Sequence, residues 1–209
     1  MELKQKLIRI TTVPISLEKL LDGQLSFMRN FFDITAISSD RSALEKIGEK
    51  NSVNVYEIEF TRKITPIKDL IAVFKLYLFL INTKPFIVHT HTPKAGTVGM
   101  IASRMAGVPH RLHTIAGLPL LEATGNKRKL LNLVEKVTYA CATKIYPNSN
   151  GLKNIIIQEK FCLPDKLKVI ANGSSNGINT EYFNPGLYSD TEILNFKQVE
   201  SIFRRLHTI

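Results

Sequence analysis

Residues 86–119 read FIVHTHTPKAGTVGMIASRMAGVPHRLHTIAGLP, and this stretch decides the fold that the sequence predicts. A β-rich apolar run occupies 86–89, a helical stretch follows at 95–105, and a second β-rich run occupies 111–115. Small residues recur through the helical stretch, which lets such a helix lie close to a sheet. A strand, a helix and a second strand in this order predict a βαβ unit with parallel strands.

The same alternation continues on both sides of this unit. Hydrophobic periodicity predicts further strands at residues 7–13, 33–38, 53–58, 144–146 and 168–170, and further helices at 17–30, 40–48, 67–81, 127–141 and 149–159. Ser16, Thr92 and Ser149 are the expected helix N-caps. The predicted fold class is therefore α/β, a Rossmann-like doubly wound parallel sheet, whose ligands bind at the carboxyl ends of the strands.

Composition narrows the class of protein. The 209 residues are 44% hydrophobic and 22% charged, which is ordinary for a soluble globular chain with a sizeable core. Twenty-eight Lys and Arg against eighteen Asp and Glu give a net charge of +10, which favours a polyanionic neighbour. Nucleic acid is not the expected one, because no aromatic residues interleave with the basic ones and no helix-turn-helix or zinc knuckle is present. Nucleotide phosphates and an acidic membrane surface remain.

The chain is expected to be cytoplasmic, with peripheral contact at the inner face of the membrane as an open alternative. Cys141 and Cys162 are too few for a disulfide framework and are predicted to be packing residues. Pro14 interrupts the basic start of the chain, so no signal peptide is predicted. Lys75 cuts the most apolar run, at 70–81, which is too short to span a bilayer.

Two common phosphate-binding motifs are missing. After the first predicted strand, residues 11–24 read TTVPISLEKLLDGQ, where a dinucleotide-binding domain would carry G-x-G-x-x-G. NAD and FAD are therefore not expected. The P-loop sequence is absent as well, so we predict no cofactor.

The pair His89 and His91 stands at the end of one predicted strand. Two residues apart on a strand, the two side chains are predicted to point the same way. Metal ligation is one interpretation, but no third ligand cluster or nearby carboxylate pair supports it, and no metal is predicted. A plain polar strand end is another. We favour a third, in which the following helix N-terminus and Lys94 face the ligand crevice and attract an anion.

His113, Thr114 and Gly117 close the next predicted strand. An imidazole at a strand's carboxyl end can hydrogen-bond a sugar hydroxyl or act as a base near neutral pH. We therefore expect the His113 ring to open into the crevice, with Gly117 permitting close backbone approach. A structural role for this histidine is the alternative.

A run of basic residues, Lys127, Arg128 and Lys129, opens a predicted helix. Such a run is usually a solvated face. Cations at a helix start oppose the helix dipole, so a functional reason gains weight, and an acidic lipid headgroup would supply one.

Several segments together resemble family-4 glycosyltransferases, the bacterial enzymes that build capsule, O-antigen or exopolysaccharide repeats. The segments are HTHTPKAG at 89–96, HTIAG at 113–117, PNS at 147–149 and NGINTEYFNP at 176–185. The resemblance covers residues 7–185 and implies the N-terminal half of a GT-B fold, in which two Rossmann-like domains face each other. It also implies a retaining, metal-independent transfer of sugar from a nucleotide-sugar donor to a glycan or lipid-linked acceptor.

The resemblance divides the chain and assigns roles. It implies an acceptor-side domain at 1–185 and a linker with a helical tail at 186–209, including an amphipathic segment at 191–206. The C-terminal donor domain, with its E-x7-E motif, is absent from this sequence. We therefore expect a chain that is inactive without that domain, or a non-catalytic binding or membrane-docking subunit that pairs with a separate donor chain. The implied catalytic residue is His113, since Ala116 stands where many relatives carry a second histidine. The implied substrate-binding residues are His89, His91, Lys94, Thr114, Gly117, Asn148, Ser149 and Asn172.

Overall fold

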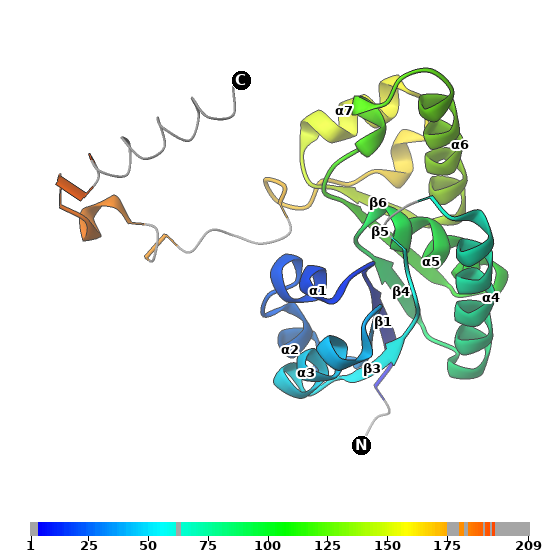
Figure 1. Cartoon of the computed structure of the whole chain (residues 1–209), viewed down its shortest axis with the longest axis horizontal. Helices are drawn as coiled ribbons and strands as arrows, with labels where there is room; N and C mark the ends of the chain where they lie inside the picture. The colour runs from blue at the N-terminus through cyan, green and yellow to red at the C-terminus, as the bar shows by residue number, and fades with distance from the viewer. Residues whose placement is uncertain are drawn as a thin grey trace. The chain divides into compact units, whose positions relative to one another are not determined.

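The computed structural model describes residues 4–61, 64–174, 180–181, 184–189, 191–192 and 194, and within them six parallel strands form one sheet. The strand order is β3-β2-β1-β4-β5-β6 (Figure 1). The strands are β1 (Lys6–Ile10), β2 (Asp33–Ser38), β3 (Asn54–Glu57), β4 (Ile87–Thr90), β5 (His110–Ile115) and β6 (Lys144–Pro147). The predicted α/β class with a parallel sheet is confirmed.

Helices cover both faces of this sheet (Figure 1). One face packs against α1 (Pro14–Leu20), α2 (Gln24–Met28) and α3 (Arg41–Asn51), and we call it the α1–α3 face. The other packs against α4 (Pro66–Thr83), α5 (Pro93–Met105) and α6 (Gly125–Cys141), and we call it the α4–α6 face. A further helix, α7 (Asn150–Gln158), follows β6, and short 3-10 helices occupy Pro119–Glu122, Pro164–Lys166 and Pro185–Leu187.

The strand order creates a switch point between β1 and β4. The chain leaves β1 toward β2 on one side of the sheet and later returns to β4 on the other. Connections therefore diverge at the carboxyl ends of β1 and β4, which is where open α/β sheets bind ligands.

Local structure differs from the sequence prediction at three places. The helix predicted at 17–30 is two helices, because Gly23 adopts a left-handed φ of 69° between them. The first of these begins at Pro14, so Ser16 is inside the helix and is not its N-cap. The strand predicted at 168–170 is absent, and only an isolated bridge joins Leu167 to Ile145.

Two N-cap predictions have different outcomes. The Ser149 hydroxyl accepts a hydrogen bond from Leu152 N at 3.1 Å and caps α7, as predicted. Thr92 occupies the N-cap position of α5 but makes no capping hydrogen bond there. Its hydroxyl is instead 2.6 Å from the Thr12 hydroxyl of the neighbouring loop.

Helix α5 lies close to the sheet, as its small residues predict. A Cβ atom on Gly96 would stand 2.4 Å from His113 Cε1, and one on Gly99 would stand 2.5 Å from Thr90 Cγ2. Real Cβ contacts do not reach such distances, so these two glycines set the spacing between α5 and strands β4 and β5.

The chain divides into two compact units, residues 1–176 and 177–209. The predicted domain boundary at 185 stays a prediction. Most of the amphipathic segment predicted at 191–206 lies outside the described residues. Within the part of the chain that the structure describes, no helix is both long and apolar enough to cross a membrane.

The glycine contacts predict that Gly96→Ala lowers the free energy of unfolding by about 1–3 kcal/mol, because the new methyl group must displace the His113 ring or α5. Gly117→Ala is the matched control, since nothing lies within 4 Å of its Cβ position. Urea denaturation of both variants checks this. Equal stability of the two variants would show that α5 shifts freely.

Candidate functional site

Threonine hydroxyls join the loops that follow β1 and β4 at the switch point. Thr12 N donates to the Thr92 hydroxyl at 2.9 Å, and the Thr12 hydroxyl accepts from Ala95 N at 3.3 Å. The Ser39 hydroxyl, after β2, donates to the Thr12 carbonyl at 2.8 Å. These bonds fix the loops that follow three strands to one another and to the first turn of α5.

A polar cluster lies on the α1–α3 face beside this junction. The rings of His89 and His91 have centroids 4.1 Å apart, so the two side chains share a face as predicted. His89 Nε2 is 2.8 Å from the Thr114 hydroxyl on β5. Tyr146 on β6 lies further along, with its ring centroid 6.0 Å from that of His89.

Arg9 of β1 belongs to the same cluster, and the sequence analysis missed it. It is paired with His89 in the β1–β4 register and is only 2% exposed. Its guanidinium donates to Gln24 Oε1 at 2.8 Å and to Met28 Sδ at 3.1 Å, both on α2. A charged residue inside the apolar run Leu7–Ile10 was the signal that could have found it.

Burial sets the protonation states of this cluster. It lowers the pKa of Arg9 to about 10, so this side chain is still a cation near neutral pH. Burial lowers the pKa of His89 and of His91 well below 6.5, and the Arg9 charge lowers both further. His91 also lies beside His89, which acts in the same direction. Both rings are therefore neutral at pH 7, able to donate one hydrogen bond and accept another.

The expectation that the His113 ring opens into the crevice is wrong. Its side chain lies on the α4–α6 face, is 3% exposed and packs against Gly96 of α5. His113 Nδ1 is 2.7 Å from the Thr90 hydroxyl. Adjacent strand residues point to opposite faces, so His113 and Thr114 separate, and only Thr114 joins the polar cluster.

Lys94 was expected to attract an anion to the crevice. In the structure it forms an ion pair with a carboxylate of the chain itself. Its Nζ is 2.5 Å from Asp69 Oδ2 on α4, and both side chains are largely buried. Asp69 also accepts from the Thr65 hydroxyl at 3.1 Å, at the start of the same helix. The pair fastens the first turn of α5 to the first turn of α4.

The remaining predicted substrate-binding residues lie at the carboxyl end of the sheet near β5 and β6. Gly117 is exposed with open space around it. Asn148 follows β6 and is half-buried, and its carbonyl accepts from Ser174 N at 2.8 Å. This bond brings the loop with the exposed Asn172 back to the end of β6, beside Ser149.

The three basic residues at the start of α6 differ in exposure and in pairing. Lys127 and Lys129 are exposed. Arg128 is not available in the same way, because it is 2.6 Å from Glu159 Oε1 and donates to the Leu120 carbonyl at 2.8 Å. Its charge holds α6 against the residue that follows α7.

The two cysteines are packing residues, as predicted. Cys141 is buried, Cys162 is half-buried, and both are reduced and lie in or against the core. Burial raises the pKa of Cys162 to about 11. Among the described residues, no group of three His, Cys, Asp or Glu side chains could hold a metal ion.

Comparison with known proteins identifies the family. Residues 22–149, more than half of the sequence, match the family described as glycosyl transferase 4-like. The chain belongs to the glycosyl transferase 4-like family. This confirms the resemblance carried by the segments around His89 and His113.

Two curated relatives extend the match beyond that range. The chain is 37% identical over 180 residues to the capsular polysaccharide biosynthesis glycosyltransferase CapM of Staphylococcus aureus, covering 86% of this chain and 46% of that one. It is 34% identical over 179 residues to the UDP-Gal:alpha-D-GlcNAc-diphosphoundecaprenol alpha-1,3-galactosyltransferase of Escherichia coli, covering 82% and 44%. The chain thus spans about half the length of these glycosyl transferase 4-like relatives.

Solved structures share the fold. Anabaena HepE, in complex with UDP and glucose, aligns with a TM-score of 0.59 at 16% identity and covers 93% of this chain and 50% of its own. A putative UDP-N-acetylglucosamine 2-epimerase from Listeria monocytogenes aligns with a TM-score of 0.60 at 16% identity, covering 82% and 46%. This glycosyl transferase 4-like chain therefore aligns with about half of each neighbour.

The buried histidine predicts a pH dependence of stability. Burial lowers the pKa of His113 to about 4 from 6.5, so the unfolded chain binds more protons between these values. Stability is full above pH 6.5 and falls by about 3 kcal/mol through this residue as the pH drops toward 4. We expect His113→Asn to remove that part of the pH dependence in urea denaturation series from pH 7 to 4.

Exposed His110, at the amino end of the same strand, supplies the matched control His110→Asn. His89 and His91 contribute with the same sign in all three proteins, and the His113 charge lowers the pKa of both, so the comparison reports His113 together with its coupling to them. An identical pH dependence in wild type and His113→Asn would show that the ring is solvated at low pH.

Proposed function

We propose that this chain is the acceptor-side part of a retaining glycosyltransferase that moves a sugar from a nucleotide-sugar donor to a lipid-linked or polysaccharide acceptor. Its membership of the glycosyl transferase 4-like family carries the proposal. The relatives support the substrate class, since one acts in capsule biosynthesis and the other on a diphosphoundecaprenol-linked sugar. The donor half of the reaction then falls to residues beyond those of this chain or to a separate chain.

The polar cluster on the α1–α3 face is the proposed acceptor contact. The half-buried His89 pairs with Thr114 at 2.8 Å. A neutral imidazole has one N–H donor and one acceptor nitrogen, and the neighbouring hydroxyl can also donate and accept. Such a pair suits recognition of a sugar hydroxyl group. Asn148, Ser149, Asn172 and Gly117 border the same end of the sheet and are proposed as further substrate contacts.

His113 is proposed as a positioning residue in place of the catalytic role that the sequence implied. Its ring separates β5 from α5 and hydrogen-bonds Thr90, one residue from His89. Through these contacts it fixes the strand that carries Thr114 and the first turn of α5. In this role His113 does not contact the reacting groups.

Transfer itself needs stabilisation of a departing nucleoside diphosphate, which cationic or dipolar donors supply in such reactions. We assign them to the proposed donor half, and Lys94 and Arg128 of this chain are engaged with Asp69 and Glu159. This division of labour predicts no transfer by the chain alone.

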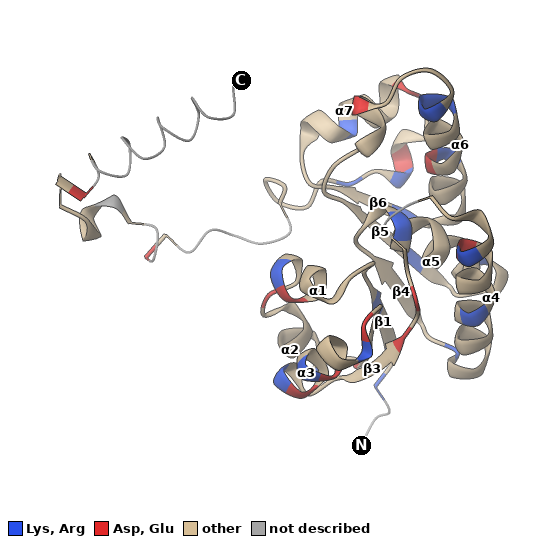
Figure 2. Ribbon diagram, viewed as in Figure 1, with Lys and Arg blue, Asp and Glu red and all other residues tan. Residues whose placement is uncertain are grey.

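We also propose that α4 and α6 dock on an anionic membrane surface, close to a lipid-linked acceptor. The outer side of α4 exposes a helical stripe of large apolar residues, with Ile67 78%, Leu70 69% and Phe74 57% exposed. Basic segments occur on both α4 and α6 (Figure 2), and Lys75, Lys127 and Lys129 of these helices are exposed. An apolar stripe with flanking lysines is the pattern of helices that lie in a membrane interface.

The transfer proposal predicts nucleotide-sugar turnover only when this chain is mixed with the donor half of a glycosyl transferase 4-like relative. In that mixture, His89→Ala is expected to lower turnover at least about tenfold, through loss of an acceptor hydrogen bond worth about 1.5 kcal/mol. His110→Ala, an exposed change at the opposite end of β5, is the control.

Turnover by the chain alone would contradict the proposed division. Acceptor binding without turnover in any mixture would favour the non-catalytic binding subunit.

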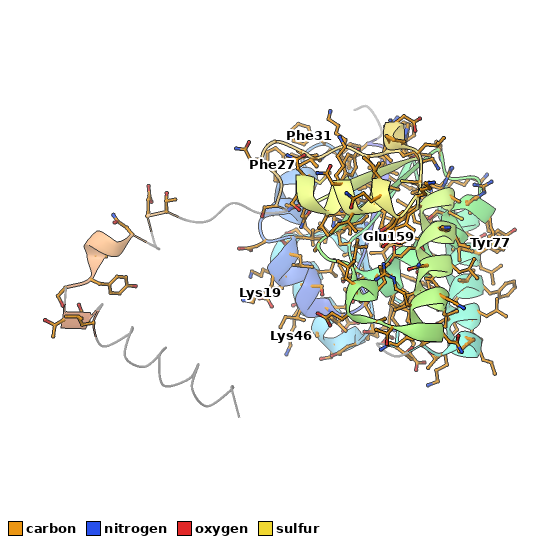
Figure 3. All side chains as sticks on the ribbon, turned by 90° about the horizontal axis from the view of Figure 1, so that it is seen from above. Lys19, Phe27, Phe31, Lys46, Tyr77 and Glu159 are labelled. Atoms are coloured by element: carbon orange, nitrogen blue, oxygen red, sulfur yellow. The ribbon has the colours of Figure 1, made fainter. Side chains whose placement is uncertain are left out.

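The membrane proposal predicts that the double variant Leu70→Gln, Phe74→Gln binds phosphatidylglycerol vesicles at least about tenfold more weakly, since two buried apolar side chains are worth about 3 kcal/mol or more. The control is Phe27→Gln with Phe31→Gln, which alters two exposed rings on the opposite side of the sheet from Tyr77 of α4 (Figure 3). Vesicle sedimentation at 0.05 and 0.5 M salt measures this. Equal binding to phosphatidylcholine and phosphatidylglycerol at low salt would contradict it.

A further inference from the structure

Arg9 is a buried cation without a counter-ion among the described residues. It is 2% exposed, and its two guanidinium hydrogen bonds go to the neutral atoms Gln24 Oε1 and Met28 Sδ. Its Nε donor is buried and has no hydrogen-bond partner within the described part of the chain. None of the ion pairs of the described chain includes it. A buried charge without an opposite charge costs several kcal/mol, so its presence calls for an explanation.

His91 is unsatisfied in the same place. Its side chain is 5% exposed, and neither ring nitrogen has a hydrogen-bond partner among the residues that the structure describes. Buried polar side chains nearly always have one, and those that lack one in a folded protein need a reason. A neutral imidazole has one N–H to donate, so this ring holds an unused donor next to an unused acceptor.

The two residues adjoin one another through His89. Arg9 is the register partner of His89 across strands β1 and β4, and the His91 ring lies 4.1 Å from the His89 ring, centroid to centroid. All three side chains therefore lie on the α1–α3 face at the carboxyl end of the switch-point strands. Among the described residues, the other titratable group that lowers the pKa of both histidines is His113, on the opposite face of the sheet, which is itself neutral at pH 7.

We propose that Arg9 and His91 form a subsite for an oxyanion, a phosphoryl or carboxylate group carried by the acceptor. The guanidinium Nε–H and the His91 N–H are donors of the kind that bind such oxygens, and the bound negative charge balances Arg9. His89 and Tyr146 are half-buried members of the cluster, so entry is proposed on their side. That the oxyanion belongs to the acceptor rests on the proposed function, whereas the anion site itself does not.

A purely structural role for Arg9 makes the opposite prediction for stability. If Arg9 is present only to tie α2 to β1, then Arg9→Met removes two hydrogen bonds and lowers Tm. If its charge awaits an oxyanion, Arg9→Met removes an uncompensated buried charge and keeps the apolar part of the side chain. In that case Tm without anions stays the same or rises.

The test measures Tm of the full chain with inorganic phosphate, inorganic diphosphate or glucuronate, at constant ionic strength set with sodium chloride and with glucose as the neutral comparator. We expect at least one oxyanion to raise Tm by roughly 5–10 °C at a hundredfold excess over its Kd. A response to the phosphates identifies a phosphoryl group, and a response to glucuronate identifies a carboxylate.

The variants decide the location. Arg9→Met should abolish the anion-dependent shift without lowering the anion-free Tm, and His91→Phe should reduce the shift while keeping an aromatic ring beside His89. Lys127→Gln controls for binding at an exposed lysine and should leave the shift unchanged. Arg111→Met should lower Tm, because Arg111 Nε donates to the Cys141 carbonyl at 2.6 Å, and it should keep the shift.

Two results would overturn the proposal. One is an oxyanion shift of the same size in Arg9→Met, and the other is no shift beyond that of chloride with any of the three probes. Because the assay contains no nucleotide sugar and measures no transfer, its outcome is separate from that of the glycosyltransferase proposal. A chain that binds oxyanions through Arg9 but never supports transfer would count against the transferase alone.

Discussion

The close approach of α5 to the sheet is the constraint on which the rest of the structure depends. Gly96 and Gly99 leave no room for a side chain between this helix and the residues His113 and Thr90. The first turn of α5 is consequently held at the loops after β1 and β4, where Ala95 N donates to the Thr12 hydroxyl. Helices α4 and α6 both pack on α5, so their positions follow from its depth.

The two faces of the same strands then take different tasks. On the α4–α6 face, Thr90 and His113 satisfy each other and fill the space beside α5. On the α1–α3 face, His89 and Thr114, which are adjacent in sequence to Thr90 and His113, lie within hydrogen-bond distance of each other. A dipeptide such as His113-Thr114 thus contributes one side chain to packing and the other to the polar cluster, since successive side chains of a strand point in opposite directions.

Helix α4 is apolar on two sides for two reasons. Its inner stripe, Ala72, Val73, Leu76 and Leu80, is buried in the core against the sheet and α5. Its outer stripe is exposed, and the membrane proposal rests on it, because contiguous exposed apolar patches often mark places of contact. Under that proposal, the exposed lysines of α4 and α6 favour an anionic surface over a neutral one.

The sequence by itself determined the alternation of strands and helices, the parallel sheet, the strand at 33–38 and the shared direction of His89 and His91. These depend on local periodicity and residue size, which a linear chain displays directly. Only the tertiary structure decided that His113 faces α5 and that Arg9 lies buried beside two histidines. The tertiary structure alone also decided that Arg128 forms an ion pair with Glu159 and that Lys94 forms one with Asp69. The two-residue period of a strand determines which side chains lie on the same face of the sheet. It does not determine which of the two faces a given helix will cover. Partners 25 and 31 residues apart meet only once the sheet has formed.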